Sequence, residues 1–176
     1  MAIALDIIGS LAIRGAIVLI ILRLNVSMQQ ALTLKTTTAN VRENLAAMVS
    51  VIETDFRQAG YGVTGTVFQK ADSNDVIFVA DFSNNGSIDT IRIYLDSSNV
   101  YRRVNSWKTL LIGSGVTQMK FEYVDITGVT TATDSTITSI KLSVGMEENY
   151  VLQELGDGRT YRPSARSTHQ FFPQNL

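Results

Sequence analysis

The sequence predicts an α+β protein, a long N-terminal α-helix packed on an antiparallel β-sheet head. Three observations lead to this fold class. Residues 1–24 are almost entirely apolar, and residues 25–59 are polar but repeat apolar side chains at helical spacing. From Tyr61 onward, β-branched and aromatic residues alternate with polar ones between turns rich in Gly, Asn and Asp. We therefore divide the chain into an apolar helix half (1–24), an amphipathic helix half (25–60) and a β head (61–176).

The apolar segment has the length of a membrane span. As a helix, residues 1–22 would extend over about 33 Å, close to the ~30 Å hydrocarbon core of a bilayer. A removed signal peptide is the competing interpretation. It fits less well, because no basic stretch precedes the apolar run and no small-x-small cleavage site follows it. We expect a retained membrane segment.

The helix is predicted to continue far beyond the apolar segment. No proline occurs before Pro163, and Gly60 is the first clear helix stop. A helix from Ile3 to Ala59 would be about 85 Å long. One apolar stripe at helical spacing is expected to pack on the head: Val41, Leu45, Met48, Val49, Ile52 and Phe56. The threonines between 33 and 38 lower helix propensity, so we expect a bend or a locally loosened helix within residues 25–40.

Two opposite charges, Asp6 and Arg14, interrupt the apolar segment. In one helix they are about 12 Å apart along the axis and about 80° apart around it, so they cannot meet. Two parallel helices offset by about 12 Å would pair them, and Gly9 and Gly15 would allow close helix packing. The alternative is that Arg14 extends to the membrane surface while Asp6 stays solvated there.

The head is predicted to be one antiparallel sheet with a single buried face, covered by the apolar stripe of the helix. Residues 84–86, Asn-Asn-Gly, give a strong hairpin signal. The predicted strands cover 75–82, 88–95, 99–104, 116–124 and 136–144, with a last extended piece within 160–172.

Composition argues against several functions. A net charge of −1 gives no electrostatic footprint for nucleic acid, and the absence of cysteine excludes thiolate chemistry. The single histidine, His169, cannot form a multi-histidine metal site. No nucleophile, base and orienting group can be assembled, so we do not expect an enzyme. Arg102 and Arg103 are interpreted as solvated or inter-subunit charges.

One loop partly matches a calcium-binding pattern. Asp81, Ser83, Asn85 and Asp89 place oxygen ligands at positions 1, 3, 5 and 9, and Gly86 stands at position 6. The twelfth position is arginine and not the usual glutamate. A plain Asn-Gly turn explains the same residues, and we favour it over a calcium site. We expect no other cofactor.

Several segments carry a family resemblance. Residues 55–61, Asp-Phe-Arg-Gln-Ala-Gly-Tyr, resemble the "D-hydrophobic-R-x-A-G-Y" helix ending of the larger minor type IV pilins and J-type pseudopilins. Segments 91–94, 100–103 and 115–123 match in order and spacing, and the closing Gln-Asn-Leu is similar to the end of such heads. Asp6 stands where that family usually has glutamate.

The resemblance implies a structural subunit of a bacterial type IV pilus-like extracellular filament. The subunit would wait in the inner membrane and then join copies of itself, with the β head outside, through the inner-membrane assembly machinery. The alternative is a minor pilin or type II secretion pseudopilin that initiates a short filament or binds a secreted substrate. Calcium occurs in related pseudopilins.

Overall fold

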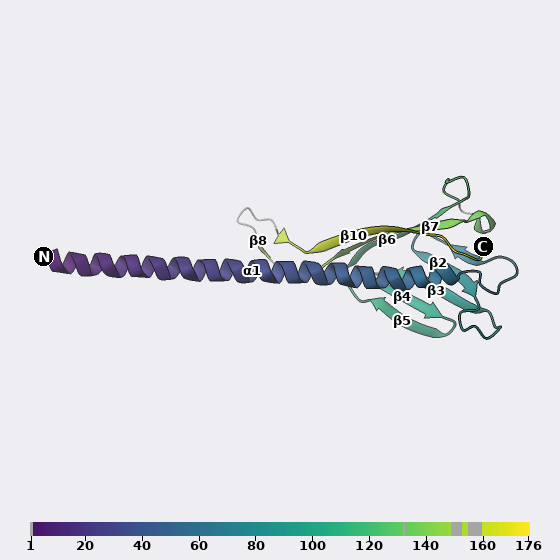
Figure 1. Cartoon of the computed structure of the whole chain (residues 1–176), viewed down its shortest axis with the longest axis horizontal. Coiled ribbons are helices and arrows are strands. Elements are labelled where there is room, and N and C mark those ends of the chain that lie inside the picture. The colour runs from purple at the N-terminus through teal and green to yellow at the C-terminus, as the bar shows by residue number, and fades with distance from the viewer. Residues whose placement is uncertain (1, 132, 149–152, 155–159) are drawn as a thin grey trace.

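The chain folds into one long helix with a β head at its C-terminal half. The computed structural model describes residues 2–131, 133–148, 153–154 and 160–176. Helix α1 comprises the 57 residues Ala2–Gln58 and is about 85 Å long. Figure 1 shows α1 as an unbroken rod whose N-terminal end extends away from the strands. The predicted α+β layout of a long helix against antiparallel sheets is confirmed.

The predicted bend or loosening within residues 25–40 is wrong, because α1 is continuous through this region and runs straight (Figure 1). The hydroxyl of Thr33 donates to the carbonyl of Gln29 at 3.0 Å, and that of Thr37 donates to the carbonyl of Thr33 at 2.9 Å. These hydroxyls are satisfied within the helix. The propensity deficit of each threonine is only several tenths of a kcal/mol, too small to break a helix on its own.

The predicted helix stop at Gly60 is confirmed. Gly60 has a φ of +82°, a conformation that favours glycine. Its N–H donates to the carbonyl of Val79 at 3.0 Å, which ties the end of the helix to strand β2 (Asp75–Ala80). A Cβ atom at this position would lie 2.0 Å from the carbonyl oxygen of Asn175. The helix end therefore meets both a sheet and the C-terminal segment.

The head contains two main sheets, so the prediction of a single sheet is wrong. The five-stranded sheet has the order β1-β2-β3-β4-β5, and the three-stranded sheet has the order β10-β7-β6. All their pairings are antiparallel. Besides β2, their strands are β1 (Phe68–Ala71), β3 (Asp89–Asp96), β4 (Asn99–Val104), β5 (Trp107–Ile112), β6 (Val116–Val124), β7 (Ser139–Glu147) and β10 (Ser164–Phe171). A short pair joins β8 (Gln153–Glu154) to β9 (Thr160–Tyr161), and a 3₁₀ turn covers Asp134–Thr136.

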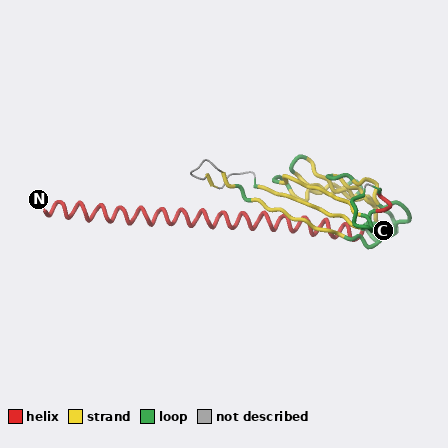
Figure 2. Tube along the Cα trace, turned by 90° about the horizontal axis from the view of Figure 1, so that it is seen from above, coloured by secondary structure: helices red, strands yellow, loops and turns green. Residues whose placement is uncertain are grey.

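The core lies where α1 meets both sheets. The residues expected to pack on the head are all buried: Val41, Leu45, Met48, Val49, Ile52 and Phe56. The Phe56 ring lies 5.2 Å from that of Phe78 on β2, 5.8 Å from Phe121 on β6 and 5.7 Å from Phe171 on β10. One helix residue thus contacts both sheets. Figure 2 shows α1 along one side of the head, which leaves its other side uncovered by strands.

A buried ion pair also holds the helix to the five-stranded sheet. The Arg102 guanidinium donates to both carboxylate oxygens of Asp55, at 2.6 and 2.9 Å. The interpretation of Arg102 as a solvated or inter-subunit charge is therefore wrong, whereas Arg103 is exposed and donates to the backbone of Asn105. Burial raises the pKa of Asp55, and the hydrogen bonds and charge of Arg102 oppose this rise. The position of Asp55, directly before Phe56 of the apolar stripe, is the feature of the sequence that could have indicated a cationic partner in the head.

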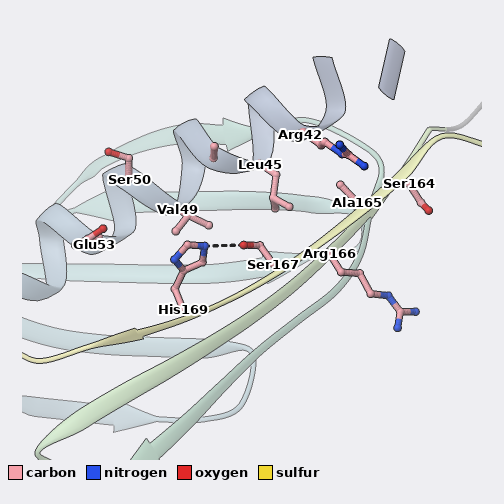
Figure 3. A pocket seen from close by; sticks show the side chains of 11 residues that line it. Arg42, Leu45, Val49, Ser50, Glu53, Ser164, Ala165, Arg166, Ser167 and His169 are labelled. Carbon is pink, nitrogen blue, oxygen red and sulfur yellow. Dashed lines mark hydrogen bonds between the residues drawn. The ribbon is translucent and has the colours of Figure 1, made fainter. Parts of the chain in front are cut away.

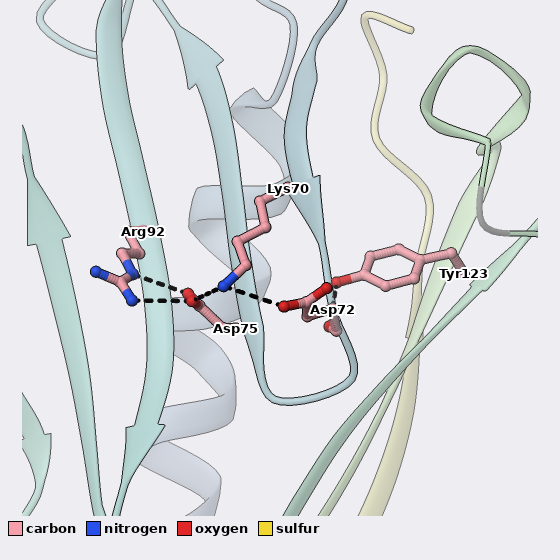
Figure 4. A network of polar contacts seen from close by, with 5 residues as sticks. All are labelled: Lys70, Asp72, Asp75, Arg92 and Tyr123. Carbon is pink, nitrogen blue, oxygen red and sulfur yellow. Dashed lines mark hydrogen bonds and ion pairs between the residues drawn. The ribbon is translucent and has the colours of Figure 1, made fainter.

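A polar network joins the two sheets (Figure 4). Arg92 donates to Asp75 at 2.8 and 2.9 Å, and Lys70 contacts both Asp75 and, at 3.0 Å, Asp72. The Tyr123 hydroxyl on β6 donates to the Asp72 carbonyl at 2.8 Å. Burial alone would raise the pKa of Asp75, but Arg92 and Lys70 outweigh it and hold the pKa below its usual value.

Candidate assembly surface

The N-terminal half of α1 exposes a long apolar surface. Its large apolar side chains are between 51 and 66% exposed: Ile7, Ile8, Leu11, Ile13, Ile17, Val18, Leu19, Ile20, Ile21, Leu22, Leu24, Val26, Met28 and Leu32. The most apolar window of the helix contains no buried residue. The helix is long and apolar enough, by length and composition, to act as a membrane anchor or signal segment.

The contact between helix and head begins abruptly. Thr37 is the first buried position of the described helix side chains, and Val41 is the first buried apolar one. From there to the end of α1, one face is covered by the sheets. The apolar surface that precedes Thr37 is therefore available to another molecule or to lipid.

The structure places the proposed inter-subunit residues in this exposed half. Arg14 is exposed and forms no ion pair within the described residues. A Cβ atom at Gly9 or Gly15 would meet no atom within 4 Å, so neither glycine is needed for packing inside the chain. Asp6 belongs to α1, but its side chain lies outside the described part of the structure. A single chain offers Arg14 no carboxylate among its described side chains.

Three calcium candidates, Asp81, Ser83 and Asn85, lie in the loop between β2 and β3, and Asp89 begins β3. Backbone and side-chain donors bond to both carboxylates. Asp81 accepts from the N–H groups of Asn85 and Gly86 at 3.0 and 2.8 Å. Asp89 accepts from Ser83 and, at 2.6 Å, from the Asn105 side chain. These hydrogen bonds, Asn105 first, hold the pKa of Asp89 below its usual value.

This loop is an Asx-type turn of eight residues, longer than the two-residue hairpin that the Asn-Gly signal suggests. Positive φ values occur at Asn84 and Gly86. Among the described residues, no group of three or more His, Cys, Asp and Glu side chains gathers as a metal site. The hydrogen bonds fit the turn interpretation, in which the acidic residues order the loop.

A groove of about 480 Å³ lies between part of α1 and the edge strand β10 (Figure 3). Leu45 and Val49 line it from the helix, and Ser167 and His169 line it from the strand. The Ser167 hydroxyl and the His169 Nε2 atom are 2.6 Å apart. No carboxylate of the described residues bonds the imidazole, and Glu53 is held by Arg57 at 2.7 Å.

Two comparisons with known proteins found no match. No protein-family model matches the chain, and no curated protein matches it. The main functional feature of the molecule is the difference in exposure between the two halves of α1.

Proposed function

We propose that this chain is a structural subunit of a helical, pilus-like filament. The apolar helix halves form the filament core, and the β heads form its outer surface. The observation that carries this proposal is the apolar half of α1, which has no buried residue in its most apolar window. This half belongs to the same continuous helix that packs on the head. An exposed apolar surface of this extent marks a site of contact with protein or membrane.

The charges favour copies of the same chain as the final partner. An arginine at membrane depth costs several kcal/mol unless it is paired or reaches water. Arg14 has no ion-pair partner within the described residues of its own chain. A parallel copy offset by eight residues, or about 12 Å, would bring its Asp6 level with Arg14. The same contact buries apolar side chains of both helices.

Before assembly, the apolar half would reside in the bacterial inner membrane, where assembly machinery would take up the subunit. Lipid covers the helix in this stage, and neighbouring helices replace lipid in the filament. The head requires no change in its own fold, because its core is already complete around Phe56.

The test is electron microscopy of material sheared from cells that express the chain. We expect filaments that contain it, and a reduced filament yield for Asp6→Ala and Arg14→Ala. Arg57→Ala is the matched control, because Arg57 is an exposed arginine at the head end of α1, bonded to Glu53. Near-ultraviolet circular dichroism should be the same for all variants, since none of the changes alters the core of the head.

Normal yield from both Asp6→Ala and Arg14→Ala would contradict charge pairing. If no filament contains the chain and it stays in the membrane fraction at low copy number, the filament proposal is wrong. The role of a minor initiator or secretion pseudopilin would then replace it.

A further inference from the structure

The helix carries two cations on one flank where it approaches the head. Lys35 and Arg42 are seven residues apart, so they lie on the same side of α1, about 10.5 Å apart along its axis. Both line one hollow of about 410 Å³ together with Tyr161. Both are exposed, and neither forms an ion pair within the described chain. We call this side of the helix the cationic flank.

The opposite flank presents carboxylates. Glu147 ends β7 and Glu148 follows it, and both line a hollow of about 280 Å³ with Val41, Asn44 and Ala47 of the helix. Glu148 has no ion-pair partner within the described residues. Glu147 has a distant one, the Arg162 Nε atom at 3.9 Å, and both side chains are more than 40% exposed. We call this side the anionic flank.

The two flanks cannot meet within one chain. Lys35 and Asn44 are nine residues apart, which places them about 180° apart around the helix axis. Two different surfaces of one chain that complement each other form a heterologous contact between copies. Repetition of such a contact builds a ring when the rotation closes and an open helical array when it does not, and a filament requires the open array.

The levels of the flanks along the axis agree with the offset deduced from the apolar half, although Arg14 and Asn44 themselves lie about 120° apart around the axis. When a second copy is displaced by eight residues, so that its Asp6 is level with Arg14 of the first, its Lys35 becomes level with residue 43. That level lies within the hollow lined by Val41, Asn44 and Ala47, where Glu147 and Glu148 reside. The two alignments use different residues at distant points along α1.

We infer that Lys35 of one copy pairs with Glu148, and with Glu147 beside it, of the next copy in the array. This inference rests on the proposed filament and deepens it by assigning a lateral contact between neighbouring subunits. An exposed ion pair adds little affinity. Its role is to fix the register of neighbouring copies and to disfavour contacts between like flanks.

Carbodiimide coupling of sheared filaments tests this contact, because the reagent joins an amine to a carboxylate only when the two touch. Lys35 is the only lysine of α1. We expect dimers and longer ladders on denaturing gels, with cross-linked peptides that join Lys35 to Glu147 or Glu148. Lys35→Arg should keep the filaments but lose these products, since arginine retains the charge and has no amine to couple. Glu147→Gln/Glu148→Gln should lose the same peptides.

A second pair of variants tests the offset. In the double variant Lys35→Arg/Arg42→Lys, the only side-chain amine of α1 lies seven residues further along the helix. This amine would couple to Glu148 only if neighbouring copies had no axial offset. Separately, Lys35→Glu should lower filament yield roughly fivefold through like-charge contact, and Lys35→Glu/Glu148→Lys should restore it.

The outcomes separate this inference from the proposed function. If electron microscopy shows filaments and Lys35 forms no cross-link with Glu147 or Glu148, the lateral contact is wrong while the filament stands. Coupling through Arg42→Lys overturns the eight-residue offset. If the unmodified chain forms no filaments at all, the proposed function itself fails before any coupling is attempted.

Discussion

Both halves of α1 carry large apolar side chains, but these side chains lie in opposite environments. In the C-terminal half, Ile52 and Phe56 are completely buried by the head. In the N-terminal half, Ile8 is 66% exposed although it belongs to the same continuous helix. Helix formation and helix burial are therefore separate properties here. The sheets determine how far burial extends, and the apolar sequence continues beyond them.

Each half also contains a charged residue among apolar ones, and only one of the two charges is paired within the described residues. Asp55 is buried and receives both hydrogen bonds of the Arg102 fork from the same chain. Arg14 is exposed and has no ion pair within the described residues. The first charge completes a fold within the chain. In the proposed assembly, the second charge would pair with a neighbouring copy.

Truncation of one large side chain in each half should give the largest contrast. Phe56→Ala should lower the free energy of unfolding of the head by about 4 kcal/mol, because it removes an aromatic ring between both sheets. Ile17→Ala should change it by less than about 0.5 kcal/mol, since Ile17 contacts no part of the head. Urea unfolding of the full chain in detergent measures both. Equal losses would contradict the division of α1.

Removal of one partner from the buried pair should have the next largest effect. Arg102→Met leaves the buried Asp55 without its guanidinium and should cost about 3 kcal/mol. The double variant Asp55→Leu/Arg102→Met should recover most of this loss, because no charge remains buried. The same unfolding titrations measure these losses. A double variant no more stable than Arg102→Met would show that the pair matters through packing.

Gly60→Ala should have a smaller but clear effect at the end of α1. The substitution forces alanine into a positive φ and places its Cβ against the Asn175 carbonyl, so we expect a loss of about 2 kcal/mol. Thermal unfolding of the full chain measures it. Gly65→Ala is the matched control, since its φ is also positive but no atom lies within 4 Å of its Cβ. The difference between the variants isolates the close approach of the C-terminal segment.

The pH dependence of stability should be the smallest effect, and it should come from the head. The pKa of Asp75 is lowered in the folded state, so its ion pairs stabilise the head above the unfolded pKa of about 3.9. This contribution is lost as the pH falls through 3.9 and then through the lower folded value. The stability difference between the wild type and Asp75→Asn should therefore shrink from pH 6 to pH 3. A constant difference would mean that the network adds no pH-dependent stability.

Local patterns in the sequence predicted the parts of the fold that depend on neighbouring residues. The apolar stripe ending in Phe56 and the stop at Gly60 both follow from helix periodicity and glycine conformation. The predicted β6 bounds, 116–124, equal those observed, whereas β7 lies about three residues later than expected. The predicted range 136–144 began with Thr136, which belongs to a 3₁₀ turn.

The division into two sheets was not predictable, because it depends on contacts between distant segments. Strand β1 has only four residues and a register shift, and most of β5 is exposed as an edge strand, so neither shows clear alternation. The Asp55–Arg102 pair joins residues 47 positions apart. The proposed flank contact could not be deduced from the sequence either, because only the folded head shows that Glu148 lies beside α1.

Helical averaging of filaments by electron cryo-microscopy tests the central claim most directly, that the exposed half of α1 is buried by copies of itself. We predict a core of parallel helices in which Asp6 of one copy is level with Arg14 of another, at an axial offset of about 12 Å. Filaments in which the heads form the core, or in which the apolar helix halves do not touch, would contradict the account.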